Sequence, residues 1–210
     1  MKIALIDGSP SRGKNAAYVL IRKIKHIFQD HEIVVFDLQQ VSSRMTLASG
    51  VNACDAFIIV SPLMLDGLPA VVIQFMADMQ YMLKKGMQCA AVVYDGMPGG
   101  RSCMTALRMV KCFAGKLHMH WSMGLGIGQG DMLTSMGKFK GGPFRHVNRS
   151  LGVMKKAMSD MQEEQDHYVD LGLPDFLYVN MSMNRWEEKA QKHGLKAKDL
   201  RNTDPAVHYF

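Results

Sequence analysis

The chain has 210 residues, of which 48% are apolar and 21% charged, and its formal net charge at pH 7 is +6. This length fits one domain with a substantial core, and no apolar run reaches the roughly 18 residues that cross a bilayer. The basic residues are scattered, so the charge favours attraction of phosphorylated small molecules over binding of nucleic acid. The four cysteines lack CxxC spacing and suggest no disulfide framework, so we expect a cytoplasmic protein.

The first strand is predicted over residues 2–7, and residues 16–28 have the apolar periodicity of a helix. Between them lies the loop GSPSRGKN (residues 8–15). Backbone N–H groups point outward from such a small-residue loop, and the dipole of the helix that follows favours an anion. This stretch therefore predicts a phosphate-binding loop.

The same loop matches most of a Walker A motif, G-x-x-x-x-G-K, through Gly8, Gly13 and Lys14. A nucleotide hydrolase would next require Ser or Thr to hold Mg²⁺, and Asn15 stands there instead. Asp37, after the apolar run IVVF of the second strand, could imitate the second metal-binding carboxylate. A P-loop-like nucleotide hydrolase therefore stays open as an alternative.

Strands and helices alternate along the rest of the first 164 residues. The further strands are predicted over residues 32–38, 56–61, 88–94 and 118–125. The further helices are predicted over residues 68–83, 101–117 and 148–164. Five strands joined by helical crossovers predict an α/β fold with a three-layer, doubly wound, five-stranded parallel sheet. We expect residues 1–164 to form this domain and residues 165–210 to form an extension.

Three loops are expected to meet at one edge of this sheet, because ligands of doubly wound sheets lie beyond the carboxyl ends of the strands. The first is GSPSRGKN, and the other two are PLMLDGLP (residues 62–69) and DGMPGG (residues 95–100). Their glycines and prolines would let the backbone lie flat along a planar ring. The three loops together predict a site for a planar heterocycle with a phosphate tail.

Other patterns predict no further site. The glycines of GLGIGQG (residues 124–130) do not fit the dinucleotide motif G-x-G-x-x-G, because its last position falls on Asp131. His118 and His120 would share one side of a strand but have no third metal ligand beside them. No serine lies in a nucleophile elbow. We therefore expect neither a metal site nor a catalytic side chain.

The extension contains an apolar stretch over residues 176–183, followed by a short helix. Asn184 could cap this helix, with Glu187 three residues later, and Gly194 would end it. The extension could cover an edge or a helix of the sheet domain, or it could form a dimer contact or a lid. The sequence leaves these alternatives open.

Three stretches resemble the flavodoxin-like-fold NAD(P)H-dependent FMN reductases and related oxidoreductases. They are LIDGSPSRGKN (residues 5–15), FIIVSPLMLDGLPAVVIQFM (residues 57–76) and, more weakly, WSMGLGIGQGDML (residues 121–133). The resemblance covers roughly residues 1–164. It implies FMN as cofactor and NAD(P)H as co-substrate, with reducing equivalents passing to a small acceptor such as a quinone, a nitro- or azo-aromatic, a metal ion or a flavin. We also expect a homodimer.

The resemblance also implies which residues hold FMN. The phosphate would lie on Ser9, Ser11, Arg12 and Asn15, and the charge of Lys14 would add to their hydrogen bonds. The ring would lie against the second loop, at Pro62, Leu63, Met64, Asp66 and Gly67. Its far edge would lie near the third loop, at Asp95, Gly96, Met97, Pro98 and Gly99. A non-catalytic flavodoxin-like electron carrier or binding module stays open as an alternative.

Overall fold

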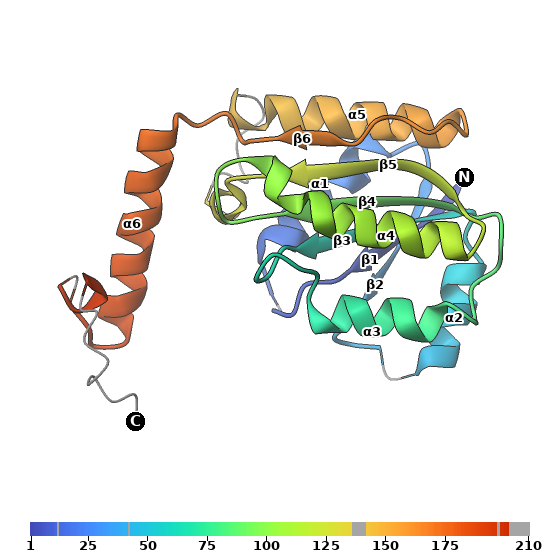
Figure 1. The fold of residues 1–210 in the computed structure, drawn as a ribbon, viewed down its shortest axis with the longest axis horizontal. Coiled ribbons are helices and arrows are strands. Elements are labelled where there is room, and N and C mark those ends of the chain that lie inside the picture. The colour runs from blue at the N-terminus through green and yellow to red at the C-terminus, as the bar shows by residue number, and fades with distance from the viewer. Residues whose placement is uncertain (12, 42, 136–141, 197, 202–210) are drawn as a thin grey trace. The chain divides into compact units, whose positions relative to one another are not determined.

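The computed structural model describes residues 1–11, 13–41, 43–135, 142–196 and 198–201. The chain divides into two compact units, Met1–Gly172 and Leu173–Phe210, which we call the sheet unit and the C-terminal unit. Figure 1 shows their helices and strands. Within the described ranges, no helix is long and apolar enough to cross a membrane.

The sheet unit contains a six-stranded parallel sheet in the order β2-β1-β3-β4-β5-β6. The strands are β1 (Lys2–Asp7), β2 (Glu32–Asp37), β3 (Ala56–Pro62), β4 (Gln88–Tyr94), β5 (His120–Ile127) and β6 (His167–Val169). The expected α/β fold with a parallel sheet is confirmed, but the expected number of five strands is wrong. The three residues of β6 are too short a run to indicate a strand. Because β6 belongs to the sheet, the sheet unit extends past residue 164 to Gly172.

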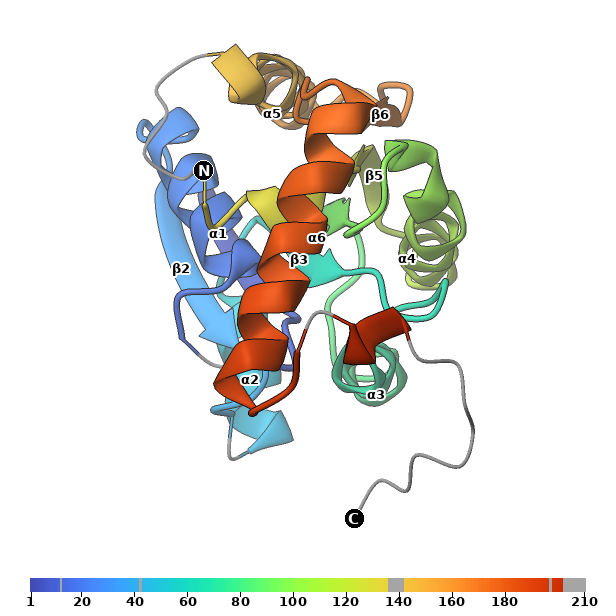
Figure 2. The ribbon, with the colours of Figure 1, turned by 90° about the vertical axis from the view of Figure 1, so that its left-hand side faces the viewer.

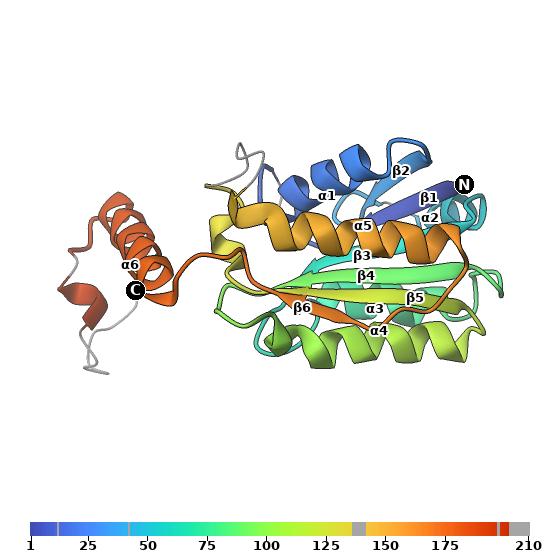
Figure 3. The same ribbon diagram turned by 90° about the horizontal axis from the view of Figure 1, so that it is seen from above.

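Helices cover both faces of the sheet, as Figure 2 shows with the strands seen from their ends. On one face α1 (Ala16–Ile27) and α5 (Arg145–Ser159) lie side by side (Figure 3). The other face is covered by α2 (Arg44–Asn52), α3 (Ala70–Met79) and α4 (Met104–Lys116). The sequence does not indicate α2, because its apolar residues form no clear stripe. A capping hydrogen bond marks its start: the Ser43 hydroxyl accepts the Thr46 N–H at 3.4 Å.

The central strands are buried on both faces, which explains their nearly continuous apolar sequences. All seven residues of β4 are buried. Cys89, Ala91 and Val93 join the core under α3 and α4. Since alternate side chains of a strand point to opposite faces, Tyr94 at the end of β4 points to the face covered by α1 and α5. This direction matters for the loop that precedes α1.

Glycines at alternate positions of β5 let neighbouring segments approach closely. A Cβ atom at Gly124 would lie 2.8 Å from Asp166 Oδ1, and one at Gly126 would lie 2.5 Å from the carbonyl oxygen of Gly100. A Cβ at Gly128 would overlap the Asp170 carboxylate. The GLGIGQG motif therefore serves the packing of β5 against β6 and against η1 (Gly100–Cys103).

The two histidines near the start of β5 do not share a strand. The strand begins at His120, and His118 lies in the preceding turn with a φ of 52°. The expected alternation of these two side chains on one strand face is therefore wrong. Among the described residues, no group of three or more His, Cys, Asp or Glu could hold a metal ion.

The C-terminal unit contains α6 (Asp175–Lys192) and a short helix, η4 (Asp199–Arg201). Its helix runs without interruption through Asn184, so the expected cap at Asn184 is wrong. It begins directly after Pro174 and has Asp175 in its first turn, where the helix dipole favours an acidic residue.

Candidate functional site

The loop between β1 and α1 is organised around the hydroxyl of Ser9, which is buried. Ser9 Oγ accepts hydrogen bonds from the Ser11 N–H at 3.3 Å and from Asn15 Nδ2 at 2.8 Å, and it donates to the Ser11 carbonyl at 3.2 Å. Asn15 also caps α1, because its Oδ1 accepts the Tyr18 N–H at 2.9 Å. The structure thus brings together three of the residues expected to hold a phosphate.

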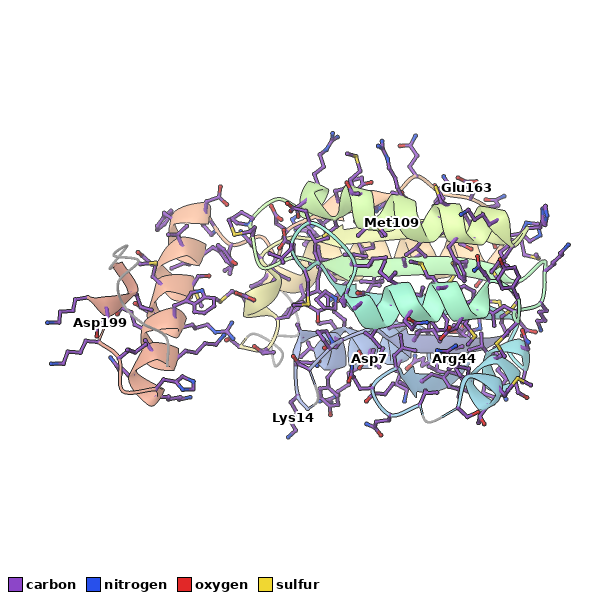
Figure 4. The ribbon with its side chains drawn as sticks, turned by 60° about the horizontal axis from the view of Figure 1, so that its bottom comes forward. Asp7, Lys14, Arg44, Met109, Glu163 and Asp199 are labelled. Carbon is purple, nitrogen blue, oxygen red and sulfur yellow. The ribbon has the colours of Figure 1, made fainter. Side chains whose placement is uncertain are left out.

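The start of α1 offers backbone donors for an anion. Within the described part of the chain, the N–H groups of Gly13, Lys14 and Ala16 have no hydrogen-bond partner. Gly13 has a φ of 97°, a conformation that glycine adopts without strain. The Lys14 side chain is exposed and extends away from the sheet in Figure 4. Arg12, also expected to bind the phosphate, lies outside the described residues.

Two carboxylates lie close to this loop. Asp7, labelled in Figure 4, accepts the Ser9 N–H on Oδ1 at 2.9 Å. Burial raises the pKa of Asp7, and the neighbouring charge of Asp37 raises it further, while the Ser9 hydrogen bond acts in the opposite direction. Asp37 itself accepts the Gln39 N–H on Oδ1 at 2.9 Å. An anion in the loop would therefore meet an acidic group on one side, which the cations of the loop must offset.

Sequence reasoning missed Tyr94, which reaches this loop from the end of β4. Its hydroxyl lies near the Ser9 side chain and the Ala17 backbone N–H, and both act to lower its pKa. Burial raises the pKa of Tyr94, and the nearby Asp7 carboxylate raises it further. The alternation of side chains along β4 gives the direction in which Tyr94 points, but no sequence pattern shows that it meets the first loop.

The second loop contains a tight hairpin at Met64–Gly67 with a two-residue turn. The N–H of Met64 donates to the Gly67 carbonyl at 2.8 Å, and the Gly67 N–H donates back at 3.0 Å. The turn residues Leu65 and Asp66 have φ values of 48° and 62°, as a type I′ turn requires. Leucine is rare in this conformation, and Leu65 is also fully exposed. Backbone strain combined with an exposed apolar side chain is typical of a functional site.

The third loop is tied to the segments beside it. Met97 is exposed, and its carbonyl accepts the Gln129 N–H at 2.8 Å. The Asp170 carboxylate accepts the N–H groups of Gly99 and Gly100 through one oxygen, at 2.9 and 3.0 Å. Asp170 follows β6, and no sequence pattern indicates that it supports this loop. Asp95 and Gly96, before Met97, and Pro98, after it, are partly buried.

Two backbone hydrogen bonds hold the three loops at one edge of the sheet. The Gly8 N–H donates to the Val60 carbonyl at 2.8 Å, which joins the first loop to β3. The Leu63 N–H donates to the Tyr94 carbonyl at 2.7 Å, which joins the second loop to β4. Pro62 and Leu63 are partly buried beneath the exposed Met64, Leu65 and Asp66. Two hollows beside α2 include no residue of these loops in their described lining.

Asn15→Ala should lower the free energy of unfolding by about 1–2 kcal/mol, because the variant loses the cap of α1 and the amide that binds Ser9 Oγ. A urea unfolding curve of the full chain measures this change. Asn15→Asp is the matched control, since its carboxylate keeps the cap but cannot donate to Ser9. We expect the Asp variant to lose clearly less stability, and equal losses in the two variants would contradict a role for the cap.

Comparisons with known proteins show the fold but no family. No protein-family model matches the chain, and no curated protein matches it. Among solved structures, an NADPH-quinone reductase from P. pentosaceus is 19% identical, covering 74% of this chain and 96% of its own, with a TM-score of 0.53. A flavone reductase is 11% identical over 79% of this chain and 66% of its own, with a TM-score of 0.57. The flavodoxin of Streptococcus pneumoniae TIGR4 is 11% identical over 77% and 99%, with a TM-score of 0.54. The sheet unit therefore has a flavodoxin-like fold.

Proposed function

We propose that this protein is an FMN-dependent oxidoreductase that passes reducing equivalents from NAD(P)H to a small acceptor. The observation that carries the proposal is that backbone N–H donors and exposed apolar side chains lie at the same edge of a flavodoxin-like sheet. Three N–H groups without a partner among the described residues lie at or just before the start of α1, and the exposed apolar tips of the second and third loops lie at the same edge. This edge includes the switch point between β1 and β3, where mononucleotides bind in folds of this strand order.

The residues present fit the two chemically different ends of FMN. The phosphate suits the N–H groups at the start of α1, and the positive charge that Lys14 and Arg12 bring to this loop in the sequence would favour an anion despite the carboxylate of Asp7. A flat ring suits Met64 and Met97, because thioether side chains pack favourably on aromatic faces. When bound, FMN would accept a hydride from the nicotinamide and supply the redox chemistry.

The protein's own residues would bind and orient rather than react. Asn15 and Ser9 fix the shape of the first loop, so that the backbone N–H groups of Gly13 and Lys14 keep one direction. The paired hydrogen bonds between Met64 and Gly67 hold the tip of the second loop rigid, and Asp170 holds the third. No side chain of this edge is assigned a proton transfer.

The visible spectrum of the purified protein, with and without added FMN, tests this proposal. We expect a yellow protein whose absorbance is bleached by NADPH or NADH in the absence of oxygen. A protein that binds FMN but is not reduced by either nucleotide would instead be an electron carrier. A colourless protein that leaves FMN fluorescence unchanged on titration would rule out both.

Met97→Glu should weaken FMN binding about 10-fold, equivalent to about 1.4 kcal/mol, because a carboxylate would replace an apolar contact and repel the anionic cofactor. The matched control is Met45→Glu, since Met45 is also exposed but lies in α2, at the opposite end of the sheet in Figure 1. Fluorescence quenching of FMN gives both dissociation constants. Equal effects of the two substitutions would indicate a general charge effect and contradict binding at the third loop.

The hydrolase interpretation has less support. Asn15 Oδ1, at the position where a hydrolase needs a Mg²⁺-binding hydroxyl, caps α1 instead. Both carboxylate oxygens of Asp37 bind the segment that follows β2, through the Gln39 N–H and Gln40 Nε2. An assay for phosphate release from ATP and GTP becomes informative only if the protein ignores FMN.

A further inference from the structure

α6 is a helix with well-defined ends. Asp175 lies in its first turn, and Gly194 ends it with a φ of 76°. The Leu195 N–H donates to the Ala190 carbonyl at 2.9 Å, which closes the last turn. Its 18 residues correspond to about 27 Å of helix. Isolated helices of this length are only marginally stable in water, so α6 needs a packed face.

One side of α6 carries an apolar stripe with regular spacing. The stripe consists of Phe176, Val179, Met183, Trp186 and Ala190. The intervals are three, four, three and four residues, which is the pattern of the a and d positions in a helix that pairs with another helix. The first four side chains are 73%, 51%, 43% and 54% exposed, respectively. The described part of the C-terminal unit therefore leaves most of the stripe uncovered.

The charges beside the stripe indicate the direction of the partner helix. Asp175 lies at the start of α6 and Lys189 near its end, two heptads later, so both occupy the same position beside the stripe. The Lys189 ammonium lies 4.6 Å from the centre of the Trp186 ring, at the border of the stripe. In a parallel pair of identical helices, Asp175 would lie level with Asp175 of the other helix, and Lys189 level with Lys189, so opposite charges would not meet. In an antiparallel pair, Asp175 of each helix lies within one turn of Lys189 of the other.

We propose that α6 is a dimerisation helix that pairs in antiparallel orientation with α6 of a second copy of this chain. Val179 of each copy packs on Met183 of the other, and Phe176 packs on Trp186. Two Asp175–Lys189 ion pairs flank the apolar contact, and the opposed helix dipoles favour the same orientation. The inference rests on α6 alone and does not depend on flavin binding by the sheet unit.

The oligomeric state of the full chain tests the proposal. Sedimentation equilibrium or light scattering should give a dimer for the natural sequence. Met183→Asp buries a charge in the stripe and should weaken the dimer at least about 100-fold, equivalent to about 2.7 kcal/mol. Asn184→Asp is the matched control, because it adds the same charge next to the stripe and should leave the dimer intact. A monomeric natural chain, or a dimer that survives Met183→Asp, would overturn the proposal.

Cysteine crosslinking distinguishes the two orientations. In a Cys112→Ser background, which removes the one exposed cysteine of the described chain, we introduce Val179→Cys alone or together with Met183→Cys. Mild oxidation should give a covalent dimer only with the double variant, since residues 179 and 183 lie opposite each other in the antiparallel pair. Efficient crosslinking through Val179→Cys alone would show a parallel pair and overturn the orientation. Circular dichroism of each variant checks that the sheet unit remains folded.

Discussion

Gly100→Ala should destabilise the sheet unit by about 3 kcal/mol. A Cβ atom at this position would lie 2.6 Å from the carbonyl oxygen of Gly126, and 2.7 and 2.8 Å from the carbonyl oxygen and nitrogen of Val169. These are backbone atoms of β5 and β6, and they cannot move without disturbing the hydrogen bonds between the two strands. The cost is therefore larger than for a clash with a flexible side chain.

Gly152→Ala is the matched control, because it adds the same methyl group to a glycine of α5 that has no neighbouring atom within 4 Å of the new Cβ. We expect this variant to gain about 0.5–1 kcal/mol, since alanine favours a helix more than glycine does. Urea unfolding of both variants gives the two changes. A loss of less than about 1 kcal/mol for Gly100→Ala would mean that β6 and η1 are not packed as described.

Raising the pH above about 8.5, the ordinary pKa of a thiol, should progressively unfold the sheet unit. Burial raises the pKa of Cys103 to about 11 and raises the pKa of Cys89 well beyond its usual range. Both thiols therefore stay protonated in the folded state at pH values where they ionise in the unfolded chain. A group whose pKa is raised by folding contributes stability below its unfolded pKa and loses it as the pH rises towards the folded pKa.

The expected slope follows from the number of such groups. Each one removes about 1.4 kcal/mol per pH unit, so Cys89 and Cys103 together remove close to twice that amount for each pH unit between their ordinary pKa and pH 10. Cys54, whose pKa burial also raises, adds to this loss. Tyr94, whose pKa burial also raises, adds to the loss at higher pH. Guanidinium unfolding at a series of pH values measures the slope. Cys89→Ala should reduce this slope by about 1.4 kcal/mol per pH unit, the contribution of one thiol. An unchanged slope would contradict a buried thiol that stays neutral in the folded state.

The main parts of the fold could be predicted because most of its strands are long and apolar. β3 and β4 are buried on both faces, and burial on both faces requires nearly continuous apolar runs, which a sequence displays directly. β6 and α2 give no such signal. β6 has three residues, and α2 is defined by the Ser43 cap more than by an apolar stripe. α6 begins after Pro174 and continues through Asn184, so the capping pattern at Asn184 does not mark a helix start.

The position of the candidate site could be predicted because parallel strands bring all their carboxyl ends to one edge. The contacts that shape the loops could not, since they join residues far apart in the chain. Asp170 binds Gly99, 71 residues earlier, and Tyr94 reaches back to Ser9. Neither residue belongs to a loop motif, and the direction in which each side chain points is defined only once the sheet has folded.

The short sixth strand also protects the sheet from other chains. Without β6, the edge of the sheet would be β5, a long strand whose Gly124 and Gly126 leave part of one face without side chains. Flat, unprotected edges of this kind pair readily with strands of other molecules and promote aggregation. β6 replaces this edge with one that is three residues long and lies between Asp166 and Asp170. A short edge with charges at both ends resists such pairing, so truncation before residue 167 would produce an aggregating chain.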